Sequence, residues 1–171
     1  VVVDRDNKRD EIGVPKDAKM ILSVGELNEN KNHRIVIEAL GKLEDSSIHY
    51  VIAGVGDQKD KLEELAKEKN VNLHLLGYRK DVAELYKCAD LYVHPSLREG
   101  LPVALMEAIA AKCNCVCSDI RGCNDLVKNG LFIPTDADSV KTQILRLFKE
   151  NNFIENYTHL KKYDLSCVDD N

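Results

Sequence analysis

The chain has 171 residues, enough for one domain with a sizeable core, and its apolar fraction of 44% is ordinary for a globular protein. Its 24 Lys and Arg residues against 29 Asp and Glu residues give a net charge of -5. The charges form no long single-sign blocks, which argues against nucleic acid as a partner. No apolar stretch approaches the roughly 20 residues of a membrane span, and charges interrupt the N-terminus too early for a signal peptide. We therefore expect a cytoplasmic protein.

In chain order, residues 1–15 are polar and without periodicity, and they predict a linker. Short apolar runs then predict strands at 20–25, 48–54, 72–77, 91–94, 115–118 and 131–134. Between the strands, one apolar helical stripe runs from Ile35 to Leu43 and another from Val82 to Ala89, and the charged segment 58–69 predicts a solvated helix. This alternation predicts a single doubly wound α/β domain, a Rossmann-like parallel sheet of about six strands with helices on both faces.

Six cysteines stand at positions 88, 113, 115, 117, 123 and 167. Cys113, Cys115 and Cys117 alternate, which would put them on one face of a strand, whereas metal sites use CxxC knuckles or nearby histidines. We expect buried, reduced thiols that act as small apolar residues, and no metal site.

In a doubly wound sheet, ligands bind beyond the carboxyl ends of the strands. At that edge, the segment 95–112 predicts a loop, then Gly100, then a helix with Pro102 in its first turn. The amides from Gly100 to Val103 should point outward at the positive end of this helix, where anions such as phosphate bind.

Two acids flank the start of this helix. Glu107 stands among apolar residues, so we expect it to be buried and to need a partner, either ligand hydroxyls or a structural ion pair with Lys or Arg. Glu99 precedes the helix, where any acid complements the helix dipole. Its spacing from Glu107 suggests that the two carboxylates frame a ligand.

Lys31 is predicted in the first turn of the helix that follows the first strand, with Asn28 or Asn30 as the cap. A cation is disfavoured at that end of a helix unless an anion binds there, so Lys31 is a candidate phosphate ligand. The alternative is a solvated lysine. His33 and His94 lie at the same edge, where a structural role is the commoner one.

The segments SVGELNENKNH, VIAGVGD, LLGYRKDVAELYKCADLYVHPS and EGLPVALMEAIA resemble, in this order, the motifs of retaining glycosyltransferases of family four. The resemblance covers roughly residues 15–150. It implies the C-terminal, donor-binding half of a two-domain GT-B fold, with residues 16–163 as that domain and residues 164–171 as the truncated start of a crossover segment. It implies no metal and no other cofactor.

By motif position, the resemblance implies that Glu99 contacts the hydroxyls of the donor sugar and that Glu107 binds the ribose diol. Lys31 would neutralise the leaving diphosphate, so Lys31 and Glu99 are the expected catalytic residues. The loop of Gly100, Leu101, Pro102 and Val103 is expected to hold the diphosphate and sugar, and the loop at Tyr78 and Arg79 is expected to flank the base. Gly25 and Glu26 are further expected substrate contacts. Relatives usually carry Arg in place of Glu26, so the site has one positive charge fewer.

Members close to this pattern build bacterial exopolysaccharide or capsule on lipid-linked acceptors. We therefore expect a nucleotide-sugar donor, with a UDP-sugar first and guanosine or adenosine diphosphate sugars next, and a lipid-linked or glycan acceptor. A full-length protein of this kind would lie at the inner face of the membrane. The family places its acceptor site and a catalytic histidine in an N-terminal domain missing here, so we expect a fragment that binds nucleotide but does not transfer sugar alone.

Two alternatives remain open. The donor half of a sugar-nucleotide epimerase shares the architecture, but epimerases lack the EGLP element followed by E-x7-E. A non-catalytic nucleotide-binding or phosphoreceiver module would need an acidic cluster after the first strand, where this chain has only Glu26. A dinucleotide site is disfavoured because Lys59 replaces the third glycine after Gly54 and Gly56, so GVG predicts a tight strand-to-helix turn.

Overall fold

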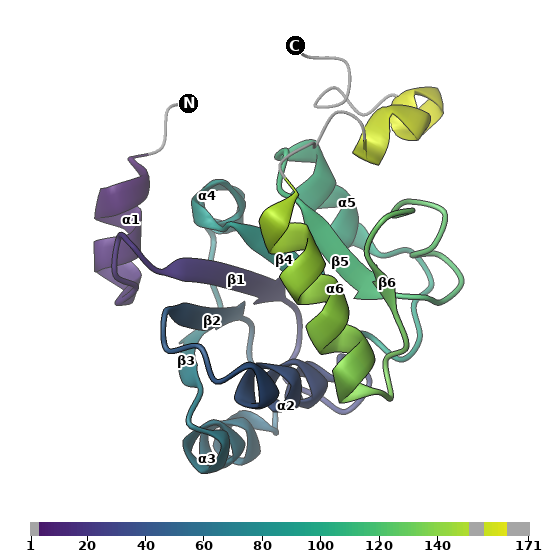
Figure 1. The fold of residues 1–171 in the computed structure, drawn as a ribbon. Helices are drawn as coiled ribbons and strands as arrows, with labels where there is room; N and C mark the ends of the chain where they lie inside the picture. The colour runs from purple at the N-terminus through teal and green to yellow at the C-terminus, as the bar shows by residue number, and fades with distance from the viewer. Residues whose placement is uncertain (1–3, 151–155, 164–171) are drawn as a thin grey trace.

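The computed structural model describes residues 4–150 and 156–163. Its core is one six-stranded sheet in the order β3-β2-β1-β4-β5-β6, in which all neighbouring strands are parallel (Figure 1). The strands are β1 (Lys19–Val24), β2 (Ile48–Ala53), β3 (Asn72–Gly77), β4 (Leu91–His94), β5 (Cys115–Ser118) and β6 (Leu131–Phe132). The predicted Rossmann-like sheet of about six strands is confirmed, and each strand lies within about two residues of its expected position.

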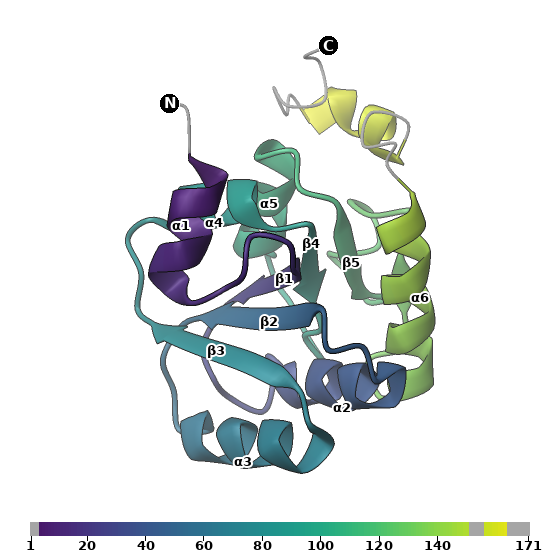
Figure 2. The same ribbon diagram turned by 60° about the vertical axis from the view of Figure 1, so that its left-hand side comes forward.

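Helices cover both faces of the sheet, as expected (Figure 2). One face carries α2 (His33–Leu43), α3 (Lys59–Lys69) and α6 (Ala137–Lys149), and the other carries α1 (Arg5–Ile12), α4 (Val82–Cys88) and α5 (Val103–Ala110). Successive residues of β1 alternate between the two cores, since Ile21 packs on the first face and Leu22 on the second. In the described ranges, no helix combines the length and hydrophobicity of a membrane span.

Two elements add to those expected from the sequence. Helix α6 buries Val140, Ile144 and Leu147 against the sheet, a spacing typical of an amphipathic helix. A short 3-10 helix, η1 (Thr158–Tyr163), buries Leu160 in the second core. The predicted crossover segment 164–171 and Cys167 lie outside the described residues.

The linker expected for residues 1–15 is wrong from Arg5 onward, because this polar segment forms helix α1. The carboxylate of Asp4 accepts a hydrogen bond from the amide of Asn7 at 3.1 Å and caps the helix. Gly13, with a φ of 84°, ends it in the left-handed conformation that favours glycine. Short local caps therefore make a helix where hydrophobic periodicity is weak.

Arg9 fixes α1 to the rest of the domain. Its guanidinium is buried and donates to the carbonyl oxygens of Cys88 (2.8 Å), Lys16 (3.1 Å) and Ala18 (2.8 Å), and to the carboxylate of Asp90 (3.0 Å). Satisfying all of these donors offsets the cost of burying the charge. The N-terminal helix is therefore an integral part of the fold.

We expect Arg9→Met to lower the free energy of unfolding by about 3 to 5 kcal/mol, because it leaves buried carbonyls without their donor and removes one of the donors to Asp90. Arg5→Met is the matched control. Arg5 pairs with the same Asp90 at 2.6 Å, but its side chain is 46% exposed, so the loss should stay below about 1 kcal/mol. Urea denaturation of both variants measures the difference, and equal losses would contradict a structural role for Arg9.

The five cysteines in the described residues are buried and form no disulfide. Cys113, Cys115 and Cys117 belong to one core, which confirms the face predicted from their alternation. Burial raises the pKa of the Cys113 thiol to about 12, so this thiol stays protonated at neutral pH. These side chains act as small core residues.

His33 begins α2 and is buried against the turn that follows β1. Its Nε2 lies 3.1 Å from the carbonyl oxygen of Glu26 and donates to it, while Nδ1 is buried without a partner. Burial lowers the pKa of His33 to about 4. The imidazole is therefore neutral in the folded protein at pH values where it would be charged in the unfolded chain.

This difference predicts that the domain loses stability as the pH falls. The folded pKa of His33 lies below its unfolded value of about 6.5, so its contribution is complete above pH 6.5 and is lost as the pH falls towards 4. The loss should reach about 3 kcal/mol at the acid end. Urea midpoints at pH 7 and pH 4.5 test this, and His33→Gln, which keeps a donor for Glu26, should flatten the dependence.

Candidate functional site

The strand order reverses between β1 and β4, which makes this position the topological switch point of the sheet. Helix α2 leaves β1 towards one face and α5 leaves β4 towards the other, so the two connecting loops meet at the carboxyl edge of the sheet. Asn30 joins these loops, since its side chain donates to the carbonyl and accepts from the amide of Arg98, each at 3.1 Å. Asn32 adds a hydrogen bond to the Pro95 carbonyl at 3.0 Å.

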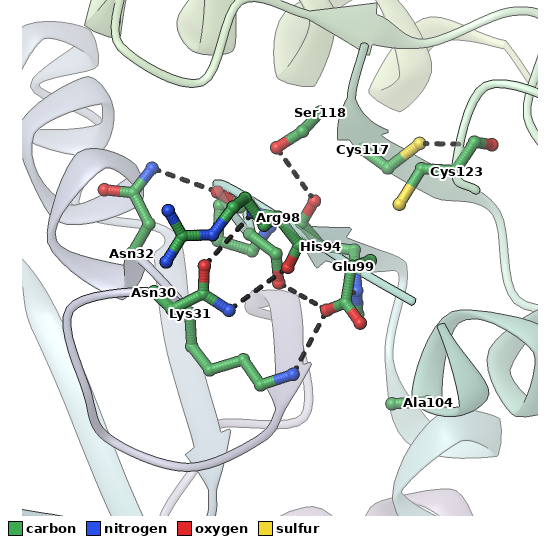
Figure 3. Close-up of polar contacts among 12 residues, drawn as sticks. Asn30, Lys31, Asn32, His94, Arg98, Glu99, Ala104, Cys117, Ser118 and Cys123 are labelled. Carbon is green, nitrogen blue, oxygen red and sulfur yellow. Dashed lines mark hydrogen bonds and ion pairs between the residues drawn. The ribbon is translucent and has the colours of Figure 1, made fainter. Parts of the chain in front are cut away.

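Glu99 stands where these loops meet, with its side chain 7% exposed (Figure 3). A single oxygen, Oε2, accepts hydrogen bonds from Lys31 Nζ at 3.1 Å, His94 Nε2 at 2.8 Å and Ser96 Oγ at 2.7 Å. Burial alone would raise the pKa of Glu99, but the donors of His94, Ser96 and Lys31 outweigh it and lower the pKa to about 2. The group is therefore a carboxylate at neutral pH, and its Oε1 has no partner within the described residues.

Lys31 was expected in the first turn of a helix, and that expectation is wrong. The chain turns through Asn32, which has a φ of 59°, and α2 begins only at His33. The side chain of Asn28 accepts the amide of Lys31 at 2.8 Å, so it caps this turn and not the helix. The anion that Lys31 contacts is Glu99, and the two residues predicted as catalytic thus form an ion pair.

His94 connects Glu99 to the end of β1. Its side chain is 5% exposed, and its Nδ1 lies 3.2 Å from the hydroxyl of Tyr92. That hydroxyl lies 3.3 Å from the carbonyl oxygen of Val24. Sequence reasoning singled out neither Tyr92 nor Ser96. The available signal was the spacing of two residues between Tyr92 and His94, which puts both on one face of β4.

Helix α5 begins at Val103, after Pro102, and no side chain caps it. The Val103 amide donates to the carbonyl of Leu101 at 2.9 Å, so it is used within the turn. The expectation that this amide points outward is therefore wrong. The amides of Gly100 and Leu101 have no acceptor in the described part of the chain. A Cβ at Gly122 would lie 3.1 Å from the Gly100 carbonyl, so this glycine lets a second turn support the loop.

Glu107 is exposed, and the expectation of a buried carboxylate is wrong. The hydroxyl of Tyr86 donates to the Ala104 carbonyl at 3.1 Å and lies 3.4 Å from Glu107 Oε1. The physical reason is that α5 needs only one apolar face towards the sheet, which is provided by Leu105, Ala108 and Ile109. The outward face carries Val103, Glu107 and Ala110 at helical spacing, and Val103 remains 52% exposed.

The remaining predicted contacts meet in one pocket of about 280 Å³ at the ends of β1, β2 and β3. It is lined by Val24, Gly25, Glu26, Ala53, Gly54, Val55, Tyr78, Arg79 and Val82. Tyr78 is 74% exposed at its mouth, and a hydrogen bond from the side chain of Asn28 holds the carboxylate of Glu26. A cavity of about 300 Å³ between the C-terminal ends of α2 and α3 contains none of the predicted residues.

Two features shape this pocket. The GVG segment forms the predicted turn between β2 and α3, and a Cβ at Gly54 would lie 2.0 Å from the Gly25 carbonyl, so this turn also packs closely on the loop after β1. The guanidinium of Arg79 binds both carboxylate oxygens of Asp81, at 2.8 and 2.7 Å, and donates to Glu11 at 2.9 Å. Two carboxylates therefore fix Arg79 and offset its charge. Within the described ranges, no group of three or more His, Cys, Asp or Glu side chains is placed to hold a metal ion.

Comparisons with known proteins identify the fold and the family. A solved structure of Anabaena HepE in complex with UDP and glucose superposes with a TM-score of 0.83 at 19% identity, covering 96% of this chain and 49% of that one. An uncharacterized glycosyltransferase of Methanocaldococcus jannaschii is 35% identical over 168 residues, which is 93% of this chain and 43% of the relative. The chain thus spans less than half the length of these proteins.

A second relative has a more specific description. The UDP-Gal:alpha-D-GlcNAc-diphosphoundecaprenol alpha-1,3-galactosyltransferase of Escherichia coli is 32% identical over 154 residues, covering 83% of this chain and 40% of that protein. The sequence model of the family described as "Glycosyl transferases group 1" matches residues 4–164, which is nearly the whole chain. The chain therefore belongs to the group 1 glycosyltransferases and has the Rossmann-like fold found in GT-B glycosyltransferases.

Proposed function

We propose that this chain is the donor-binding half of a retaining glycosyltransferase that transfers a sugar from a nucleotide sugar. A UDP-sugar is the first candidate for this donor. The observation that carries the proposal is the meeting of Lys31 and Glu99 at the switch point, beside the uncapped start of α5. A cation next to the free amides of Gly100 and Leu101, just before α5, suits a diphosphate. A carboxylate with one unoccupied oxygen suits the hydroxyl donors of a sugar.

The relatives support the same reaction class. The Escherichia coli relative is named for UDP-Gal as donor and a diphosphoundecaprenol-linked acceptor, and the Anabaena structure was solved with UDP and glucose. Both favour glycosyl transfer over the epimerase and the non-catalytic alternatives. We propose a lipid-linked or glycan acceptor in cell-surface polysaccharide synthesis at the cytoplasmic face of a membrane. Because the relatives are more than twice as long, we assign acceptor recognition to a second domain.

The proposed chemistry needs charge stabilisation from this half. When the bond between the anomeric carbon and the diphosphate breaks, negative charge grows on the departing phosphate oxygens. Lys31 and the amides of Gly100 and Leu101 would stabilise that charge, while Glu99 would hold the sugar by its hydroxyls. In this proposal, Glu26 adds no positive charge, so the amides of Gly100 and Leu101 provide more of the phosphate binding.

The pocket at Tyr78 would receive the base of the nucleotide. Its lining is largely apolar and its volume of about 280 Å³ is enough for one small ring system. Glu107 would accept hydrogen bonds from the ribose diol, and its exposure makes this possible without any rearrangement of α5. Arg79 would support the pocket wall, since Asp81 and Glu11 already occupy its donors.

We expect Lys31→Met to weaken binding of UDP about tenfold, as the loss of one charge-assisted hydrogen bond implies. Binding of UMP, which lacks the second phosphate, should change less. Lys61→Met, a lysine exposed on α3, is the matched control and should leave both affinities unchanged. Isothermal titration calorimetry of the unsubstituted chain and of both variants measures the affinities for UDP and UMP. Equal losses for UDP and UMP would argue against a contact between Lys31 and the diphosphate.

We expect Glu107→Ala to weaken UDP binding by roughly tenfold or more, because a hydrogen bond to a charged group contributes about 1.5 to 3 kcal/mol. Glu64→Ala removes an equally exposed carboxylate from α3 and should have no effect. The titration should be run with UDP, GDP and ADP, with UDP expected to bind most tightly. An unchanged affinity for every nucleotide would exclude the ribose contact.

A further inference from the structure

We infer that His94 and Tyr92 are positioning residues, which hold one oxygen of Glu99 so that the other is directed at the donor sugar. The inference rests on the proposed function and adds the residues that orient its sugar-binding carboxylate. Neither residue needs to touch the ligand. Both are buried, with exposed fractions of 4% for His94 and 0% for Tyr92.

The starting observation is the asymmetry of the Glu99 carboxylate. All three donors, from Lys31, His94 and Ser96, converge on Oε2, and none reaches Oε1 (Figure 3). Three donors from different directions fix the rotation of the carboxylate plane. Oε1 is therefore held as an acceptor in a defined direction, and a sugar hydroxyl is a donor that would complete it.

The contacts along this chain follow from what each group can donate. A carboxylate only accepts, so His94 carries a proton on Nε2 and donates it to Oε2. On the other side of the ring, Nδ1 lies 3.2 Å from the hydroxyl of Tyr92. That hydroxyl donates to the carbonyl of Val24 at 3.3 Å and accepts from the amide of Val24 at 3.4 Å. These contacts form a chain from the end of β1 to Glu99.

Lys31 and His94 have different tasks on the same oxygen. The side chain of Lys31 is 28% exposed, so it can turn towards a diphosphate when one binds. His94 and Ser96 are buried and stay on Oε2 when Lys31 moves. Glu99 then keeps two donors in the ligand-bound state, and its direction does not depend on the cation that serves the phosphate.

This division predicts a selective defect. Substitutions at His94 and Tyr92 should reduce only the part of the affinity that the sugar contributes, because UDP without a sugar does not reach Glu99. The quantity to measure is the ratio of the affinity for a UDP-sugar to the affinity for UDP. A general structural defect would instead lower both affinities together.

The experiment is calorimetric titration of the chain with UDP and with UDP-glucose, UDP-galactose and UDP-N-acetylglucosamine, using for the ratio the sugar that the unsubstituted chain binds best. For His94→Leu, we expect the ratio to fall about tenfold with UDP affinity within twofold of its original value. His94→Gln, whose amide N–H can replace Nε2, should restore most of it. Tyr92→Phe should lower the ratio several-fold.

Tyr50→Phe is the matched control. Tyr50 is also fully buried in the sheet, but its hydroxyl bonds to Ser23 on the α2 face, away from the site. It should leave the ratio unchanged. Circular dichroism checks the fold of each variant, and if His94→Leu does not fold, His94→Gln and Tyr92→Phe decide the outcome: an unchanged ratio in Tyr92→Phe then overturns the inference.

Three other results would also overturn it: a ratio that His94→Leu leaves unchanged, equal losses for UDP and the UDP-sugars in that variant, or a fall of the ratio in Tyr50→Phe as large as in Tyr92→Phe.

The proposed function fails separately. If the unsubstituted chain binds no nucleotide, donor binding and this inference both fail. If it binds UDP and binds every UDP-sugar with the same affinity as UDP, the inference alone is overturned.

Discussion

A single carboxylate oxygen links the two halves of this sheet. Oε2 of Glu99, in the loop after β4, accepts a hydrogen bond from Lys31, in the loop after β1, across 68 positions of sequence. The contact exists because the strand order reverses between β1 and β4, which sends α2 and α5 to opposite faces and leaves the loops before these helices side by side. The site therefore depends on the topology as much as on the residues.

The electrostatics of the site are unusual for one that would bind a diphosphate. Glu26 and Glu99 lie at the carboxyl edge of the sheet, Glu107 lies on the outward face of α5, and Lys31 is already paired with Glu99. In the proposed function, an anionic ligand obtains much of its stabilisation from backbone amides and the dipole of α5, whose first turn contains no acidic residue. The buried donors around Glu99 also keep that acid ionised, so it remains an acceptor for hydroxyl groups.

The surface around the site is apolar as well as charged. Of the large hydrophobic side chains exposed in the described residues, Val55, Tyr78, Leu101, Val103 and Ile133 all follow the carboxyl ends of strands. Single exposed apolar side chains are common, but their concentration at one edge is typical of a binding surface. The opposite end of the domain is fixed by α1 and Arg9, and Glu11 of α1 reaches the pocket wall through Arg79.

The sequence by itself determined the sheet, because short apolar runs separated by amphipathic helices leave little choice but a parallel sheet covered on both faces. It also placed Lys31, Glu99 and the GVG turn at the correct edge. It could not place α1, because the apolar signal there is weak and the helix is held by caps and by the long-range bonds of Arg9.

Only the tertiary structure decided what each charged group contacts. An acid in an apolar helix looks buried in the sequence, yet Glu107 is exposed because α5 packs through one face only. A lysine near a helix start looks unpartnered, yet Lys31 has Glu99, and His94 and Tyr92 gain their meaning only beside it. The physical reason is that periodicity reports which residues are apolar, whereas ion pairs and hydrogen bonds depend on distances between loops that only the packed sheet brings together.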